Sequence, residues 1–293
     1  MTHIEAISNG LGAQSMRMVL MAGDGELSAK LSITAETGWE TDRLWSDGTR
    51  ASNQVYFDQV VVPLCAQLGL DAVLVEALDR DGNRVPPLGE WVRQQVETGK
   101  LNHIKIPLFG SNGGRLRQIC TSRKKVAAIR QELRRRGATT ARMAHGLHAG
   151  EVLRMKGVEG RVGDGGWYTL TAFDVGWQSH FYPLIERRIF RADCQATLKD
   201  RGVPWLLSSE CDGCPHKDYA RWARTSPHVI DDLADLESKM NGEFFFTDKR
   251  IPLREAIAVM AVDDERKRAR LPDHGMFDDD PDFGCDEGGV CGV

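Results

Sequence analysis

Apolar and polar positions follow two different periods along the first part of the chain, and this pattern predicts strands that alternate with helices. Short apolar runs typical of strands occur near residues 4–7, 31–35, 71–78 and 140–147. Helical spacing follows from about Ser15, at 51–68 and at 121–136. This alternation predicts an α/β fold with a mainly parallel sheet flanked by helices. Beyond Trp177 the pattern is mainly helical, over 187–201, 217–223, 226–240 and 252–260.

Composition narrows the class of protein. The 293 residues are 41% hydrophobic and 27% charged, and no apolar run approaches the roughly 18 residues of a membrane span. The first ten residues contain Glu5 and no Lys or Arg, unlike a secretory signal. We therefore expect a cytoplasmic protein that is not embedded in a membrane. We expect one nucleotide-binding domain with a helical C-terminal region over 1–262, and an acidic, disordered, cysteine-containing tail over 263–293.

Charge is distributed unevenly. The formal net charge is -4, but Asp273 to Val293 contains seven acidic residues and no basic one, so the rest of the chain carries +3. Between Arg115 and Arg136, nine basic residues accompany a single acidic one, Glu132. Such a segment suits a nucleotide or nucleic acid, and a solvated helix face is the alternative.

A glycine-containing loop follows the first predicted strand. In SNGLGAQS, Gly10 and Gly12 would let the backbone approach an anion, and the helix that follows would direct free N–H groups at it. The loop matches neither the dinucleotide fingerprint nor the Walker lysine loop. It predicts phosphate binding without specifying the ligand.

The seven cysteines suggest metal or redox chemistry, because clustered thiols in a cytosolic protein seldom form disulfides. Cys211 and Cys214 form a C-x-x-C motif, and Cys120 and Cys194 could complete a four-thiolate site. Zinc and a [4Fe–4S] cluster both accept four thiolates, so spacing does not separate them. His216 is an alternative zinc ligand, and a redox C-x-x-C beside two core thiols is the simpler reading.

The segments SNGLGAQS, ITAETGWE, CTSRKKVAAIR, GLHAGEVLRMK, FYPLIERRIFRADC and CDGCPHK occur in this order. Together they resemble the phosphoadenosine phosphosulfate reductase-like branch of the adenine nucleotide alpha hydrolase (PP-loop) superfamily. The resemblance spans about Ile7 to Lys217. Two positions depart from the family pattern: Leu11 replaces the second loop glycine, and Gln14 replaces an aspartate that would organise a metal-bound triphosphate.

The resemblance implies a set of nucleotide-binding residues. These residues come from four segments: the phosphate loop, the end of the second strand, the C-T segment and the D-E-x-x-R-like segment. In that order they are Ser8, Asn9, Gly10, Gly12 and Ser15; Glu36, Thr37 and Gly38; Arg123 and Lys124; and Glu151 and Arg154. Lys125 matches the lysine of the C-T segment and is expected to act in catalysis. The ligand would be ATP, which would bring Mg²⁺, or adenylyl sulfate.

The C-terminal segment carries two further cysteines, Cys285 and Cys291. In sulfonucleotide reductases the nucleophilic cysteine also lies on a C-terminal segment, so the resemblance implies a catalytic role for these thiols. Their acidic neighbours would raise the thiol pKa values and disfavour the thiolate. A metal pair, a disulfide switch and an inert end are the alternatives.

These observations predict an enzyme of sulfur metabolism that binds an adenine nucleotide and uses an Fe–S cluster and thiol chemistry. In the reductase version, a thiolate attacks the sulfur of adenylyl sulfate, and the product releases sulfite on reduction. One alternative is an ATP pyrophosphatase-type sulfurtransferase that acts on nucleic acid with a protein sulfur donor. Another is a non-catalytic nucleotide- or DNA-associated protein with a structural four-cysteine site.

Overall fold

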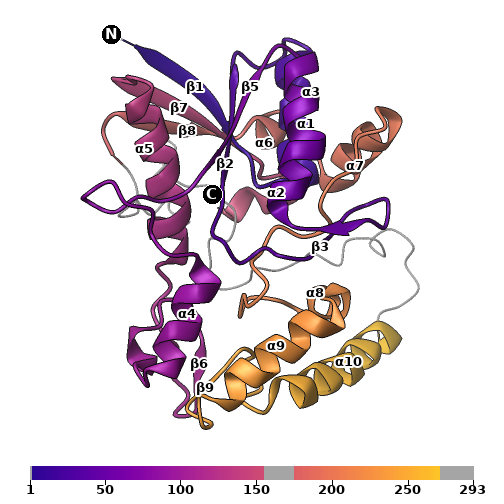
Figure 1. Ribbon diagram of the computed structural model, residues 1–293. Helices are drawn as coiled ribbons and strands as arrows, with labels where there is room; N and C mark the ends of the chain where they lie inside the picture. Colours follow the sequence, from indigo (N-terminus) through magenta and orange to yellow (C-terminus); the bar gives the residue numbers. More distant parts are fainter. Residues whose placement is uncertain (1, 155–174, 271–293) are drawn as a thin grey trace, which may run out of the picture.

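A five-stranded sheet forms the centre of the computed structural model, which describes residues 2–154 and 175–270 (Figure 1). The strands follow the spatial order β5–β2–β1–β7–β8, and each runs parallel to its neighbours. Their bounds are β1 (His3–Ser8), β2 (Leu31–Ala35), β5 (Asp71–Val75), β7 (Thr140–His145) and β8 (Gln178–Phe181). The predicted α/β class and parallel sheet are confirmed.

The central strand β1 is buried on both faces. Successive side chains of a strand point to opposite faces, so Ile7 joins the apolar cluster that contains α1, and Ala6 joins the cluster that contains α5. Neither side chain has exposed surface. Burial on both faces explains why the segment reads as an apolar run rather than as an alternation.

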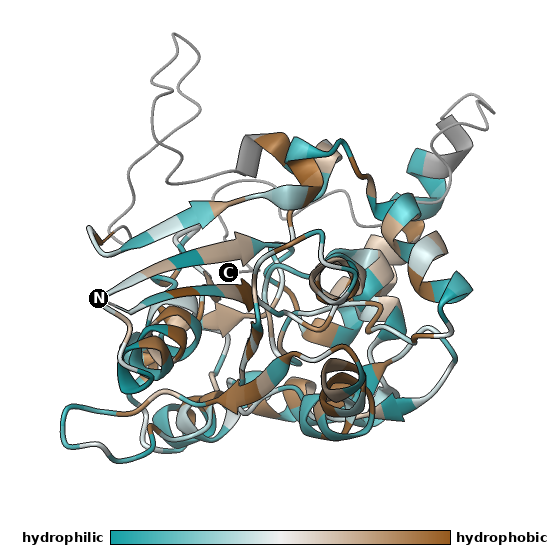
Figure 2. Cartoon of the chain, turned by 90° about the horizontal axis from the view of Figure 1, so that it is seen from above, coloured by the Kyte–Doolittle hydropathy of each residue, from teal (hydrophilic) through white to brown (hydrophobic). Residues whose placement is uncertain are grey.

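Helices cover both faces of the sheet (Figure 1). On one face α1 packs against β1, α3 packs against β5, and α7 packs against α1, whereas α5 packs against β2 and β5. Figure 2 shows apolar segments (brown) within the interior strands and helices and hydrophilic residues (teal) toward the outside. The helical segments of this layer are α1 (Ala13–Gly23), α2 (Asn53–Tyr56), η1 (Phe57–Val61), α3 (Val62–Gln67), η3 (Thr121–Val126), α5 (Ala127–Arg135), η4 (Ala149–Arg154), α6 (Pro183–Glu186) and α7 (Arg191–Asp200).

The strand order creates a crevice between β1 and β7. From β1 the chain crosses to β2 and then β5 on one side, and from β7 it crosses to β8 on the other. Connections that diverge from two neighbouring parallel strands leave a crevice beyond their carboxyl ends, where open α/β sheets bind ligands. The pairing Ser8↔His145 places the ends of these two strands side by side.

A second apolar cluster lies outside the sheet, below it in Figure 1. It includes Trp222, Phe246 and Met240, none of which has exposed surface. The elements of this region are α4 (Leu88–Glu97), η2 (Leu101–His103), β6 (Phe109–Gly110), α8 (Tyr219–Arg224), α9 (Pro227–Ser238), β9 (Phe244–Phe245) and α10 (Leu253–Arg270). A two-stranded pair, β3 (Arg43–Leu44) and β4 (Arg50–Ala51), follows the loop after β2.

Two features of the C-terminal region were not predicted from the sequence. The region beyond Trp177 is mainly helical, as predicted, but residues 178–181 form the strand β8. Its sequence QSHF carries no clear apolar alternation, and pairing with β7 from Ala141↔Gln178 to Ala144↔Phe181 supplies the strand conformation. The last helix, α10, continues to Arg270, past the expected domain end at 262. Within the described residues, no helix is both long and apolar enough to cross a membrane.

Trp39 lies within the second apolar cluster, between α4 and the loop of the C-x-x-C motif. Its indole is 2% exposed and lies edge-on to Phe246, with the ring centroids 6.3 Å apart. The ring is also covered by two glycines: a Cβ added to Gly89 would lie 2.6 Å from the ring, and one added to Gly213 would lie 2.3 Å from it. Helix α4 and the loop of the C-x-x-C motif therefore both depend on glycine at the point where they meet Trp39.

We expect Gly213→Ala to lower the free energy of unfolding by about 1–3 kcal/mol, because the new methyl group overlaps the indole and the packed neighbours must shift. Gly176→Ala is the matched control, since nothing lies within 4 Å of its added Cβ. Urea unfolding followed by tryptophan fluorescence measures both changes. Equal stabilities for the two variants would contradict the tight packing at Trp39.

Candidate functional site

A pocket opens at the carboxyl ends of β1, β2 and β7, at the crevice that the strand order creates. It collects residues from segments that are far apart in the sequence. Its described lining consists of Ser8, Asn9, Gly10, Leu11, Gly12, Gln14, Ser15, Thr34, Ala35, Glu40, Asn53, Lys125, Ile129, Gly146, Leu147, Glu151 and Ser209. We call this the nucleotide pocket, after the ligand that the sequence analysis predicts for it. It contains seven of the residues predicted to bind or act on the nucleotide.

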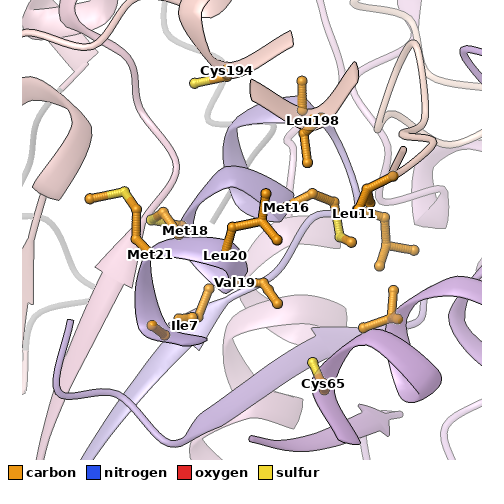
Figure 3. Close-up of a cluster of buried hydrophobic side chains, with 14 of the residues drawn as sticks. Ile7, Leu11, Met16, Met18, Val19, Leu20, Met21, Cys65, Cys194 and Leu198 are labelled. Carbon is orange, nitrogen blue, oxygen red and sulfur yellow. The ribbon is translucent and has the colours of Figure 1, made fainter. Parts of the chain in front are cut away.

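The phosphate loop has a tightly specified backbone. Leu11 adopts a left-handed conformation with φ 66°, which costs a non-glycine residue about 1–2 kcal/mol. Its amide donates to Asn9 Oδ1 at 2.8 Å, and its side chain is fully buried beside Met16 and Val19 (Figure 3). Burying a leucine contributes about 1.5–3 kcal/mol, which offsets the strain. The buried leucine thus anchors the loop in a left-handed conformation that glycine would adopt without strain.

Helix α1 begins directly at the pocket. Gly12 is its N-cap and supplies no side-chain hydrogen bond, so the first backbone N–H groups of the helix are left for another acceptor. Gly10 N donates to Ser15 Oγ at 3.1 Å, which closes the loop. Gly146, at the end of β7, lies so close that a Cβ there would be 3.1 Å from Ser15 N. The arrangement suits an anion at the helix N-terminus.

Two glutamates from the ETGWE segment interact near the pocket. Glu40 is 3% exposed, lines the pocket and accepts hydrogen bonds from Thr37 Oγ1 at 2.7 Å and from Trp39 N at 3.1 Å. Glu36 accepts a hydrogen bond from Gly38 N at 2.8 Å. Burial, together with the Glu40 carboxylate, raises the pKa of Glu36 to about 9. Burial opposes ionisation of Glu40 as well, but its contacts with Glu36, Lys125 and Thr37 hold the pKa of Glu40 below its usual value.

Three of the predicted metal-binding cysteines line a second, smaller pocket, which we call the thiol pocket. Cys120, Cys211 and Cys214 share it with Lys125, Thr37 and His216. Because Lys125 also lines the nucleotide pocket, its ammonium group connects the two sites. It belongs to the π-helical segment η3, and such turns are frequent at functional sites.

Cys211 is buried and contacts two polar side chains. Its Sγ lies 3.2 Å from Glu40 Oε1, to which it donates, and 3.3 Å from Thr37 Oγ1. Burial and the Glu40 carboxylate raise the pKa of Cys211 well above its usual value. The thiol pocket therefore holds Cys211 in its protonated form unless a bound group changes its surroundings.

A buried ionic network anchors the loop that carries Cys211. Arg43 and Asp212 are 4% and 3% exposed and approach to 3.7 Å. Thr41 donates twice to Asp212 Oδ2, and Lys217 Nζ donates to the Asp212 carbonyl at 2.8 Å. A buried ion pair needs such additional hydrogen bonds to offset desolvation. The sequence analysis did not identify this network, because the partners come from distant segments.

Cys194 does not join the other three predicted ligands. It lies on α7, fully buried in the apolar cluster of α1 (Figure 3), whereas Cys211 and Cys214 belong to the cluster around Trp39. The expected four-thiolate set is therefore not assembled, because α7 turns this side chain toward the sheet layer. No group of three or more His, Cys, Asp or Glu side chains among residues 2–154 and 175–270 is arranged to hold a metal ion.

His216 lies at the rim of the thiol pocket. One of its ring nitrogens lies 2.7 Å from Arg115, and the other lies 3.2 Å from Gln118 Oε1. Burial and the charge of Arg115 lower the pKa of His216 to about 4. The imidazole is thus neutral near pH 7, which is the form that ligates metals.

The remaining predicted residues fall in different places. Lys124 is buried, and its Nζ binds the carbonyl oxygens of Val85 and Pro86 instead of lining the nucleotide pocket. Arg123 is exposed and lines neither pocket. Glu151 lines the nucleotide pocket and accepts a hydrogen bond from His148 N at 3.1 Å. The side chain of Arg154, together with Cys285 and Cys291, lies outside the described part of the chain.

The basic segment is largely engaged with the protein itself. Arg134 lies over the Trp177 ring at 3.8 Å, and Arg136 pairs with Glu132 and Asp71. At least six of the nine basic side chains contact the protein's own groups: Arg115, Lys124, Arg130, Arg134, Arg135 and Arg136. These contacts favour the solvated or packed helix face over a continuous nucleic-acid surface.

The sequence analysis did not assign several residues of the pocket lining, among them the polar residues Thr34, Glu40, Asn53 and Ser209. Thr34 and Glu40 flank the recognised Glu36–Gly38 segment and could have been included by proximity. Asn53 begins α2, and nothing in the sequence indicates that this helix start faces the strand ends. Comparisons with known proteins add no assignment, since neither a protein-family model nor a curated protein sequence matches the chain.

The Glu36 carboxyl predicts a specific pH dependence of stability. Between the model-compound value of 4.5 and about 9, the folded protein retains a proton that the unfolded chain releases, so the free energy of unfolding falls as pH rises. In Glu36→Gln this loss is absent. Relative to wild type, the variant should gain stability on the order of a few kcal/mol between about pH 5 and about pH 9. Urea unfolding at both pH values is the measurement, and parallel profiles would contradict the buried neutral carboxyl.

Proposed function

We propose that this chain is an adenine nucleotide-binding enzyme of sulfur metabolism, similar to phosphoadenosine phosphosulfate reductase. The observation that carries the proposal is the pairing of two pockets. The nucleotide pocket combines the phosphate loop, Lys125 and Glu151, and the adjoining thiol pocket combines Cys120, Cys211 and Cys214. A nucleotide phosphate or sulfate group held beside Lys125 would lie next to reduced sulfur.

In the proposed reaction, the N-terminus of α1 and the loop glycines bind the phosphate group of adenylyl sulfate. Lys125 stabilises the negative charge of the sulfonate group as it passes from the nucleotide to the attacking thiolate. A protein thiolate attacks the sulfur atom, the bond to the phosphate oxygen breaks, and AMP departs. A second thiol or thiol reductant then attacks the thiolate sulfur of the adduct and releases sulfite. Cys285 or Cys291 would supply the first thiolate, as the resemblance implies.

A metal or Fe–S cluster in the thiol pocket is part of the proposal, with a changed ligand set. The four thiolates expected from the sequence do not fit, because Cys194 belongs to a different apolar cluster. Cys120, Cys211 and Cys214 line one pocket. Their side chains are not grouped around a metal ion among the described residues, so they would have to turn toward a common point to bind one, and three protein ligands would leave one position for an external group. No step of the proposed reaction depends on this group.

The sulfurtransferase alternative shares the nucleotide pocket but differs in its products. It would release pyrophosphate from ATP, whereas the reductase would release sulfite from adenylyl sulfate. Gln14, which lines the pocket where the family has aspartate, removes a carboxylate that would hold Mg²⁺ on a triphosphate. This substitution favours the reductase. An anaerobic assay for sulfite and for pyrophosphate separates these two, and release of neither would favour the non-catalytic alternative.

Nucleotide binding is tested most directly at Gly12. A Cβ at this position meets only Gln14 Oε1 at 3.7 Å and Leu206 O at 4.0 Å, so the protein itself tolerates it. Gly12→Val should therefore keep the melting temperature but weaken binding of ATP and adenylyl sulfate about ten-fold or more, because the side chain occupies ligand space. Titration calorimetry measures the affinities, with GTP as the control ligand. If the adenine nucleotides bind no better than GTP, the proposed ligand class is wrong.

The metal is tested by comparing two cysteines. We expect anaerobically purified protein to contain iron and sulfide. Cys211→Ser should lose both, whereas Cys194→Ala should retain them, because of these two cysteines only Cys211 lines the thiol pocket. Elemental analysis and the visible spectrum provide the readout. Stoichiometric zinc without iron would contradict the cluster, and metal loss in Cys194→Ala would contradict the three-cysteine ligand set.

A further inference from the structure

Two polar atoms of the nucleotide pocket have no hydrogen-bond partner among the described residues. They are Thr34 Oγ1 and Asn53 Oδ1, on side chains that are 2% and 7% exposed. Both residues line the pocket. A buried polar atom without a partner costs about 1–3 kcal/mol, so such atoms in a pocket indicate a ligand that completes them.

The position of Thr34 relative to the phosphate loop limits which part of a nucleotide it can reach. Ser32 Oγ accepts a hydrogen bond from Asn9 Nδ2 at 3.1 Å, which ties β2 to the loop. Thr34 follows two residues later on the same face of β2, about 7 Å further along the strand. Since Ser8 pairs with Ile33, Thr34 lies level with Asn9 at the start of the loop, where the ribose next to a loop-bound phosphate can reach it.

Asn53 is held rigidly on the same side of the pocket. Its backbone N–H donates to the Glu40 carbonyl at 3.1 Å, and Ser52 caps the start of α2 by accepting from Val55 N at 3.3 Å. The side chain therefore leaves a backbone that is anchored on both sides. An amide oxygen in this setting suits an O–H donor of the ligand.

We propose that Thr34 and Asn53 bind the 2′- and 3′-hydroxyl groups of the nucleotide's ribose, so that the pocket selects ribonucleotides whose 3′-hydroxyl carries no phosphate. This inference rests on the proposed function and specifies its substrate class: adenylyl sulfate or ATP rather than the 3′-phosphorylated nucleotide. A 3′-phosphate would bring acceptor oxygens toward Asn53 Oδ1 and the Glu40 carboxyl group. Lys125 is the only basic side chain among the described residues of the pocket lining, and the proposed function already assigns it to the phosphate or sulfate group.

The test combines a deletion on the protein with a deletion on the ligand. Titration calorimetry on the full chain compares ATP with 2′-deoxy-ATP and 3′-deoxy-ATP, and adenylyl sulfate with its 3′-phosphorylated form. Wild-type protein should prefer ATP and adenylyl sulfate about ten-fold, the effect of one well-placed hydrogen bond. The near-isosteric variant Asn53→Leu should bind ATP more weakly and 3′-deoxy-ATP about as well as wild type, and Thr34→Val should do the same with 2′-deoxy-ATP. The preference for the hydroxyl should therefore disappear.

The outcomes separate this inference from the proposed function. If each variant weakens ATP and its matching deoxynucleotide equally, the two residues have only a structural role and the inference is overturned. If the 3′-phosphorylated nucleotide binds as tightly as adenylyl sulfate, the predicted selectivity is overturned while the proposed function stands. If no adenine nucleotide binds to wild type, both fail. Gly176→Leu, at a site with open space around its Cβ, controls for unspecific effects of a new side chain.

Discussion

The position of the thiol loop depends on the packing of Trp39 between two glycines. The indole fills the space between α4 and the C-x-x-C loop, and Gly89 and Gly213 leave no room for a side chain at either contact. Trp39 lies in the loop that follows β2. The segment that leaves this edge of the sheet therefore also packs against the loop that carries the thiols. This packing brings a cysteine-containing loop within hydrogen-bond distance of Glu40, which lines the nucleotide pocket.

The nucleotide pocket is a consequence of strand order. Because the crossovers leave β1 and β7 in opposite directions, a crevice opens between the ends of these strands. Leu11 then shapes the phosphate loop: its strained backbone is held by a side chain buried in the core beneath α1. The loop is therefore part of the hydrophobic core as much as part of the binding site, and its conformation is set before any ligand binds.

Buried charge connects the two pockets. Glu36, Glu40 and Lys125 interact in a region with little exposed surface, and their effects on one another separate the two carboxyl pKa values widely. Two carboxyl groups with separated pKa values can hold and release protons independently. Beside thiols, one group can therefore carry a proton while the other stays ionised. The Arg43–Asp212 network provides a second set of buried charges that fixes the loop of Cys211 from its other side.

The sequence by itself determined the elements that depend on local pattern. Apolar runs identified β1, β2, β5 and β7, helical spacing identified α1, α5 and α9, and the order of short motifs indicated the residues of the phosphate loop. Only the tertiary structure decided which residues meet. Cys194 and Cys211 look equivalent as thiols, yet α7 carries one into the core of the sheet layer while Trp39 holds the other in the thiol pocket. Lys124 and Lys125 are neighbours, yet the helical turn directs one to backbone carbonyls and the other to the pockets. Such choices depend on contacts between distant segments, and local sequence patterns carry no information about them.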